Sequence, residues 1–402
     1  MKYTVILLLA GLSMLGPLGI DMYLPAMPTI SAQLGAEPWV VQLSLSTYLV
    51  GLAVMMLVYG ALSDRLGRRP VLLWSTAAFT LCSLAVACSM NAEQLLMFRI
   101  LQGMSAGAGG VVGRALIQDA LQGAAAMRAM SQVIMAFVLA PAFAPVVGGY
   151  LLEALGWRAI FLVQAGFGAV LFIWASMQLA ETLKPEQRAR LNLRTLATSY
   201  QSIARDMHFQ AMVVGGSLAF MVFSLYIGSA TWFVLDVLTL QVTQFGWVFM
   251  PLVAGAILGS AVSARQASLW SRGKQMRVGY AVLLFASTCN VVYFMCSETP
   301  AVPWAVLALG GASFGFGLVT PCISLLAVER HARCRGMANS LFSFEQTLFF
   351  AAVTAFLCPA LAPSALALAG ALLFAVLLSA CIVARARVNQ RSFDQVSANQ
   401  HY

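Results

Sequence analysis

Residues 60–71 read Gly60-Ala-Leu-Ser-Asp64-Arg65-Leu-Gly67-Arg68-Arg69-Pro70-Val71, a short charged turn between two long apolar stretches at 39–62 and 70–89. Each stretch has roughly the 17–25 residues that a helix needs to cross a bilayer. Gly67 permits a tight reversal, the arginines suit anionic headgroups at an inner membrane surface, and Asp64 can pair with an arginine or cap a helix. The segment therefore predicts two membrane helices joined by a tight loop.

The same alternation of long apolar stretches and short polar loops continues along the chain. Of its 402 residues, 61% are hydrophobic and only 9% are charged. A soluble fold of this size needs more charge on its surface, so soluble enzymes and nucleic-acid-binding proteins are excluded. The stretches are too long and too evenly apolar for outer-membrane strands. We predict an all-α membrane protein with twelve transmembrane helices, at 4–29, 39–62, 70–89, 93–117, 129–152, 158–180, 210–233, 244–264, 278–297, 301–324, 337–358 and 363–384.

The basic residues indicate how the chain is oriented. Arg99 and Arg114 lie within spans, and Arg158 is the single cation in the loops of one side. The other twenty of the 23 Lys and Arg residues lie in the loops of the opposite side or at the two ends of the sequence. The positive-inside rule makes that side cytoplasmic. We expect a multi-pass protein of the bacterial inner (cytoplasmic) membrane with both termini cytoplasmic.

A long polar segment at 181–209 divides the spans into six and six. This division predicts an N-terminal six-helix half (1–180), a cytoplasmic linker (181–209), a C-terminal six-helix half (210–384) and a cytoplasmic tail (385–402). It is typical of a duplicated six-helix unit. Any polytopic protein needs polar inner loops, so a linker without duplication is the alternative.

Several segments resemble one transporter family. The loop at 60–71 resembles, in length, order and location, the loop signature of the major facilitator superfamily. Span four reads Arg99-Ile-Leu-Gln102-Gly103, similar to the Arg-x-x-Gln-Gly element of that superfamily. Span five reads Ala144-Pro145-Val-Val-Gly148-Gly149, similar to the Gly-Pro-x-x-Gly-Gly element of its antiporters, with Ala144 in place of the first glycine. Three further stretches resemble the bicyclomycin/chloramphenicol-resistance (Bcr/CflA-type) drug:proton antiporters: Gly19-Ile-Asp21-Met-Tyr23-Leu-Pro25-Ala-Met-Pro28, Leu45-Ser46-Thr-Tyr48-Leu49 and Trp157-Arg158-Ala-Ile-Phe161.

The resemblance implies a major facilitator fold and efflux of antibiotics or metabolites, without naming the cargo. It also implies a charge network that locks the two halves in the outward-facing state, formed by Gly60, Asp64, Arg65, Gly67, Arg68 and Arg69. The corresponding loop of the second half, from Ser263 to Lys274, keeps the charge but not the pattern.

Two ionisable residues lie deep in the first half of the chain. A charge near the bilayer centre costs at least ~2.5–3.5 kcal/mol and is a functional candidate by default. Asp21 lies ~12 Å, and Arg99 ~9 Å, from the outer ends of their spans. We predict that they meet, directly or through water, and that a carboxylate beside a movable arginine takes up a proton on one side and releases it on the other. A static pair that holds two helices together is the alternative.

Other candidates surround the predicted cavity. Three roles are open for Glu345, in span eleven: binding a cationic cargo, binding a second proton, or hydrogen-bonding a neighbouring helix through Gln346. Tyr48 and Gln102 are further candidates for the substrate cavity. Arg114 either reaches the cytoplasmic headgroups or helps to close the inner gate. Kinks and small residues in span five favour a hinge or close helix packing at Pro141, Pro145, Gly148 and Gly149.

Together these features predict a proton-coupled efflux transporter that works by alternating access, with Asp21 as the proton site. Expected partners are a small-molecule cargo, protons and membrane lipid, with no nucleic acid, no cofactor and no metal, and with the chain as a monomer. One alternative is a transporter of the same fold that moves a native metabolite, such as a nucleoside, sugar or amino acid, by symport or exchange. A membrane-embedded enzyme or receptor is disfavoured because the spans offer no HExxH, Ser/His pair or carboxylate cluster, and no GxxxxGK[ST] pattern indicates ATP as the energy source.

Overall fold

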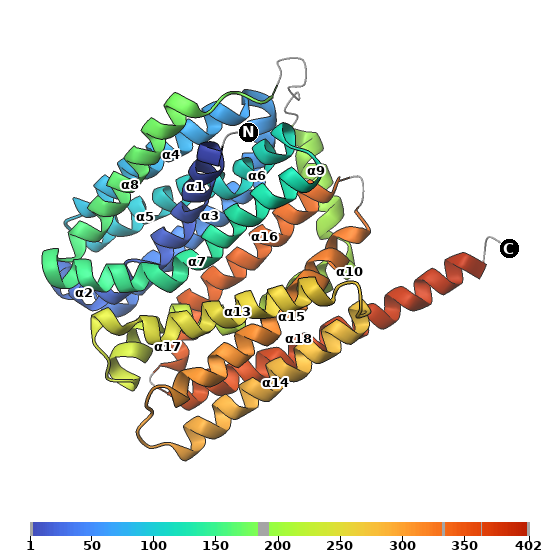
Figure 1. Ribbon diagram of the computed structural model, residues 1–402. Helices are drawn as coiled ribbons and strands as arrows, with labels where there is room; N and C mark the ends of the chain where they lie inside the picture. Colours follow the sequence, from blue (N-terminus) through green and yellow to red (C-terminus); the bar gives the residue numbers. More distant parts are fainter. Residues whose placement is uncertain (1–2, 184–192, 332–333, 363, 400–402) are drawn as a thin grey trace.

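The computed structural model describes residues 3–183, 193–331, 334–362 and 364–399. The middle of the predicted linker and the end of the predicted tail lie outside these ranges, as do Lys184, Arg188, Arg190 and Arg333. The described part of the chain is helical and contains no strand. Figure 1 shows the helices packed side by side as one elongated bundle.

The helices that precede the linker are here called the first half. They are α1 (Tyr3–Asp21), η1 (Leu24–Ala26), α2 (Met27–Leu34), α3 (Pro38–Leu66), α4 (Arg68–Ala87), α5 (Ala92–Ala106), α6 (Ala108–Ala120), α7 (Gly123–Leu155) and α8 (Trp157–Gln178). The linker contains α9 (Leu193–Ala204).

The helices that follow the linker are called the second half. They are α10 (Met207–Ala219), α11 (Met221–Gly228), α12 (Ala230–Trp232), η3 (Phe233–Val237), η4 (Val242–Gln244), α13 (Gly246–Gln266), α14 (Arg272–Cys296), α15 (Trp304–Glu329), α16 (Arg335–Ala352), η6 (Val353–Leu357), α17 (Cys358–Leu361) and α18 (Ala365–Asn399).

The expected number of spans is confirmed. Eleven helices of the described chain are long and apolar enough to cross a membrane. The pair α10 and α11, bent by 46° at a short break, makes twelve when it is counted as one span. The predicted all-α fold class is therefore correct, although several spans are longer than their apolar stretches and some are broken inside the membrane.

The break in the first span follows from its prolines. In a continuous helix, the backbone N–H of Pro25 would donate to the carbonyl of Asp21, but proline has no such donor. The α-helix ends at Asp21, and the chain continues as the short 3₁₀ helix η1 and then as α2. The sequence stretch 4–29 does not predict this break from its hydropathy, because the broken part stays apolar.

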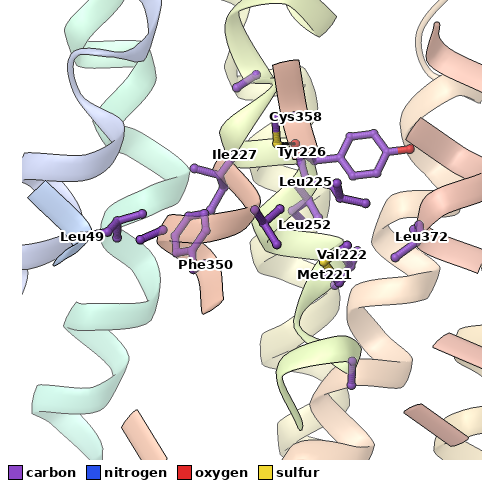
Figure 2. Packing of buried hydrophobic residues seen from close by; sticks show 14 of the residues in the cluster. Leu49, Met221, Val222, Leu225, Tyr226, Ile227, Leu252, Phe350, Cys358 and Leu372 are labelled. Carbon is purple, nitrogen blue, oxygen red and sulfur yellow. Dashed lines mark hydrogen bonds between the residues drawn. The ribbon is translucent and has the colours of Figure 1, made fainter. Parts of the chain in front are cut away.

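The two halves meet most closely at one end of the bundle. We call the end that carries α9 the linker end, and the end that carries the loops at 35–37 and 297–303 the far end. In Figure 1, α7 and α13 approach each other toward the far end and diverge toward the linker end. Along the rest of the boundary α3 packs against α16, with Leu49 lying near Phe350 in a shared apolar cluster (Figure 2).

Polar contacts join the halves at the far end. Gln42 of α3 donates to the carbonyl oxygens of Gly228 and Thr354, at 3.2 Å each. The hydroxyls of Ser46 and Thr354 are 2.9 Å apart, and Thr231 donates to the carbonyl of Leu24 at 2.7 Å. Thr354 belongs to the π-helical turn η6. Such turns break the regular hydrogen-bond pattern of a helix. Here the carbonyl oxygen of Thr354 accepts a hydrogen bond from the side chain of Gln42 instead.

Glycines bring helix backbones into direct contact within each half. A Cβ atom on Gly103 of α5 would lie 2.0 Å from the carbonyl oxygen of Tyr48 on α3. In the second half, a Cβ atom on Gly255 of α13 would lie 2.1 Å from the carbonyl oxygen of Gly310 on α15. These crossings join the second and fourth spans of each half, and the duplication stays a prediction. The first of them sets the distance between Tyr48 and the helix that carries Arg99.

We expect the Gly103→Ala variant to lower the free energy of unfolding by about 1–3 kcal/mol, because the added methyl group forces α3 and α5 apart. The control is Gly166→Ala in α8, where a Cβ atom meets nothing within 4 Å and the change stays under about 1 kcal/mol. Thermal unfolding in detergent measures both variants. Equal melting temperatures for the two would show that the crossing is not tightly packed.

Candidate functional site

Asp21 lies at the break of the first span. It is the last residue of α1, and its side chain is only 1% exposed. Its Oδ1 atom has no hydrogen-bond partner among the described residues. A carboxylate at the C-terminal end of a helix faces the negative end of the helix dipole, and burial removes its hydration. The site therefore disfavours a negative charge on Asp21 unless a cation approaches it.

Arg99 of α5 is fully buried and lies between two aromatic rings. Its guanidinium carbon is 4.3 Å from the ring centroid of Tyr23 and 4.3 Å from that of Tyr48, and Phe161 is 5.9 Å away. A desolvated cation over an aromatic face gains about 2 kcal/mol. Nη1 donates to Oε1 of Gln102 at 2.6 Å, whereas Nε and Nη2 have no hydrogen-bond partner in the described chain. Two donors of Arg99 therefore remain available.

The predicted direct contact between Asp21 and Arg99 is wrong for this structure. The described residues form no ion pair between these two side chains. The reason is the position of Tyr23 and Tyr48. The guanidinium of Arg99 contacts their rings and not the carboxylate of Asp21. Asp21 and Arg99 are nevertheless linked through Tyr23, which lies two residues after Asp21 and places its ring 4.3 Å from the guanidinium carbon. Whether the two side chains meet through water stays a prediction.

The two tyrosines are themselves held in place. The hydroxyl of Tyr48 donates to the carbonyl oxygen of Gly16 on α1 at 2.9 Å. The hydroxyl of Tyr23 lies 3.2 Å from that of Ser44 on α3. Tyr48 was expected in the substrate cavity, but it is fully buried here, as is Gln102. In this conformation both residues surround Arg99, and a contact with cargo stays a prediction for them.

A chain of amide side chains extends from Arg99. Nε2 of Gln102 donates to the hydroxyl of Ser83 at 2.8 Å and to Oε1 of Gln164 at 2.9 Å. Nε2 of Gln164 donates to the carbonyl oxygen of Leu18 on α1 at 3.2 Å. Gln164 and Ser83 were not among the expected site residues. A single amide inside an otherwise apolar span is the signal that could have identified Gln164.

Beside Gln164 lies a cavity of about 510 Å³ within the first half. Its wall is apolar except at Gln164. Helices α1, α7 and α8 and Met22, the residue directly after α1, line it; the helical lining residues include Met14, Leu18, Ala140, Phe143 and Phe167.

Glu345 and Gln346 lie in the second half, on α16, and both contact α10. Oε1 of Glu345 accepts from Nε2 of Gln210 at 3.1 Å. Nε2 of Gln346 donates to the carbonyl oxygen of Gly216 at 3.4 Å. Both side chains are half-buried. These contacts fit the expectation that Glu345 hydrogen-bonds a neighbouring helix, while a role in binding cargo or protons stays a prediction.

The charged loop at 60–71 forms a network at the linker end. Arg68 is buried, and its guanidinium contacts Asp64 at 2.5 Å, Asp119 of α6 at 3.0 Å and Ser63 at 2.6 Å. Arg69 donates to the carbonyl oxygen of Ser176 on α8 at 2.9 Å. All of these contacts stay within the first half, so the expected lock between the halves stays a prediction.

Glu181, which was not among the expected site residues, completes this network. Its carboxylate accepts the backbone N–H groups of Arg68 and Arg69, at 3.0 and 3.2 Å, and also those of Thr182 and Leu183. Arg68 and Arg69 are the first residues of α4, where backbone donors lack partners within the helix and a negative charge is favourable. Gly67 has φ = 107°, and a Cβ atom on it would lie 2.3 Å from Oε2 of Glu181. Gly67 therefore allows both the reversal of the chain direction and the close approach of the Glu181 carboxylate.

The second half builds its corresponding loop differently. Arg272 pairs with Glu329, and Lys274 lies over the ring of Trp270 at 5.0 Å. Gln275 donates to the hydroxyl of Ser263. As expected, this loop carries charged residues, but their contacts differ from those of the loop at 60–71.

The remaining expected residues lie in continuous helices. Pro141, Pro145, Gly148 and Gly149 all belong to α7, which runs through them unbroken. A Cβ atom on Gly148 would lie 1.8 Å from the carbonyl oxygen of Met22, and one on Gly149 would lie 2.1 Å from that of Val242 in the second half. Close packing accounts for both glycines, and a hinge in this region stays a prediction.

Arg114 lies on an exposed face of α6. Its Nε atom donates to the carbonyl oxygen of Gly110 at 2.6 Å, within the same helix. Neither of its two predicted roles is tested by this contact.

We expect the Glu181→Ala variant to speed amide hydrogen exchange at Arg68 and Arg69 about fivefold, because the loss of a helix cap costs ~1 kcal/mol. The matched control is Glu153→Ala, at an exposed position near the end of α7. Exchange measured by mass spectrometry on the purified protein tests this. Unchanged exchange in the Glu181 variant would mean that its carboxylate does not hold the start of α4.

Comparison with known proteins agrees with this architecture. The Major Facilitator Superfamily model matches residues 9–354. An uncharacterized MFS-type transporter, YdgK of Bacillus subtilis, is 31% identical over 83% of this chain and 83% of its own. The bicyclomycin resistance protein homolog of Haemophilus influenzae is 28% identical over 84% of each chain. The multidrug transporter MdfA of Shigella boydii is 27% identical over 83% of this chain and 81% of its own.

A solved structure shares the fold. The human organic anion transporter MFSD10 superposes with a TM-score of 0.68 at 19% identity, covering 94% of this chain and 99% of that one. Both the family model and the first relative cover most of the chain. The chain is therefore a transporter that belongs to the Major Facilitator Superfamily, and its relatives confirm the resemblance to Bcr/CflA-type drug antiporters.

Proposed function

We propose that this protein is a proton-coupled efflux transporter of drugs or related small molecules, with Asp21 as the proton site. The observation that carries the proposal is the burial of Asp21 beside Arg99 without an ion pair between them. Two opposite charges that share a buried site without pairing cost free energy, unless the carboxyl group holds a proton. The arrangement supports a state in which Asp21 is protonated.

Arg99 provides the means to release that proton. Two of its nitrogen donors have no hydrogen-bond partner in the described chain. Movement of the guanidinium from the tyrosine rings to Asp21 favours the carboxylate, since a nearby positive charge stabilises the ionised form. The proton would then leave Asp21. Uptake and release would alternate as the halves change the side to which the site is open.

The contacts between the halves support such a change of access. Gln42, Ser46 and Thr231 join the halves at the far end, and α7 and α13 diverge toward the linker end (Figure 1). If the linker end is cytoplasmic, as the basic residues predict, this is an inward-facing conformation in the bacterial inner membrane. The network around Arg68 would then lock the halves only in the outward-facing state.

The relatives support the class of cargo. Their names include a bicyclomycin resistance protein homolog and a multidrug transporter. We infer a small-molecule cargo of that kind, moved outward by a monomer surrounded by membrane lipid. Transport of a native metabolite by the same fold is the alternative, and the direction of proton-driven transport in everted vesicles distinguishes the two.

We expect the Asp21→Asn variant to lose proton release when cargo is added to the purified protein, by about tenfold or more, because an amide cannot carry the transported proton. The probes are bicyclomycin and chloramphenicol, and a pH-sensitive dye measures the released protons. The control is Asp236→Asn, at an exposed position in η3, which should release protons as the parent does. Parent-like release by the Asp21 variant would exclude this residue as the coupling site.

Glu345 carries a separate prediction. If its half-buried carboxylate attracts cationic cargo, the Glu345→Gln variant should bind ethidium about five- to tenfold more weakly, a loss of roughly 1–1.4 kcal/mol. Binding of the neutral compound chloramphenicol should not change. Equilibrium binding in detergent measures both compounds. Unaltered ethidium affinity would show that Glu345 does not bind cationic cargo, and its contact with Gln210 would be its remaining role.

A further inference from the structure

We infer that Gln164 of α8 is a positioning residue that determines where Arg99 lies and therefore when Asp21 binds its proton. This inference rests on the proposed function of Asp21. Gln164 contacts neither charged group directly. It acts through Gln102 and through the backbone of α1.

The first step is the orientation of Gln102. A side-chain amide has one oxygen that accepts and one NH₂ group with two donors. The NH₂ group of Gln102 has two acceptors, the hydroxyl of Ser83 at 2.8 Å and Oε1 of Gln164 at 2.9 Å. With both donors used, Oε1 of Gln102 is turned to Nη1 of Arg99, at 2.6 Å. Gln164 thus helps to present an acceptor, and not a donor, to the buried cation.

The second step is the orientation of Gln164 itself. Its Nε2 atom donates to the carbonyl oxygen of Leu18, which lies three residues before Asp21. That donation leaves its Oε1 atom facing Gln102. Gln164 is only 2% exposed, so both bonds are largely withdrawn from solvent. The chain of bonds therefore joins the backbone of α1, close to the proton site, to the guanidinium of Arg99.

The third step is the energetic consequence. A buried amide that loses its fixed partner reorients, and a buried donor without a partner costs free energy. If Gln102 no longer accepts from Arg99, the carboxylate of Asp21 becomes the best remaining acceptor for the guanidinium. Tyr23 and Tyr48, the ionisable side chains whose rings lie against Arg99, have hydroxyls that are already hydrogen-bonded, to Ser44 and to the Gly16 carbonyl. Closer approach of Arg99 to Asp21 means that protonation requires a lower pH.

The test follows the protonation of Asp21 in the full-length protein without any cargo. Infrared difference spectroscopy over a pH titration detects the carbonyl stretch of a protonated carboxyl group, and the band missing in Asp21→Asn belongs to Asp21. We expect Gln164→Leu to move the midpoint of this band about 0.5–1 pH unit lower, the effect of losing one hydrogen bond in a buried network. Gln164→Asn, whose amide is withdrawn by one methylene group, should move it in the same direction and is the variant to use if the leucine variant does not fold.

The control is Asn290→Leu, which removes a buried amide that donates to the hydroxyl of Tyr226 at 2.6 Å in the second half. It costs stability in the same way but should leave the Asp21 midpoint where it is in the parent. A midpoint that is equal in the parent and in both Gln164 variants would overturn the role of Gln164 while leaving the proposed function intact. A midpoint that moves as far in Asn290→Leu as in Gln164→Leu would also overturn it. If no band in the parent depends on Asp21, the proposed proton site itself is wrong.

Discussion

A buried acid and a buried base that do not touch impose the main constraint on the first half of this transporter. Asp21 and Arg99 are both withdrawn from water, and each must be accommodated by neighbours that carry no net charge. Tyr23 and Tyr48 supply aromatic faces to the cation, and Gln102 supplies an oxygen. The acid receives no such help at Oδ1. This imbalance is the feature on which the proposed proton exchange at Asp21 rests.

The enclosure of Arg99 depends on close backbone contacts between helices. Aromatic faces can enclose a guanidinium only if the helices that carry them are at fixed distances. The crossing at Gly103 sets α3 against α5 without intervening side chains, and the hydroxyl of Tyr48 ties α3 to α1. In the second half, the equivalent crossing at Gly255 is present without a buried arginine of this kind in α15. The packing is therefore common to both halves, and the first half uses it to hold a charge.

Much of this architecture can be predicted from composition and motifs, since long apolar stretches and one-sided basic loops leave few alternatives. The depth of Asp21 and Arg99 was predicted from residue counts, and both are buried as expected. Their direct pairing was not correct, because the choice between a carboxylate and two aromatic rings depends on side-chain directions that spacing does not encode. Pro25 did carry a local signal for the break at Asp21. Gln164 and Glu181 act across helices that are distant in sequence, so only the folded chain brings them to their partners.

Glu181 also has a mechanical consequence. It lies three residues after the end of α8, where the chain leaves the first half for the connection to the second. Its carboxylate accepts hydrogen bonds from the first two residues of α4. This carboxylate therefore joins the segment that follows α8 to the turn that carries Arg68. If the halves move relative to each other as proposed, a force on the segment after α8 reaches that turn first, so the charged loop would respond together with the start of the connection.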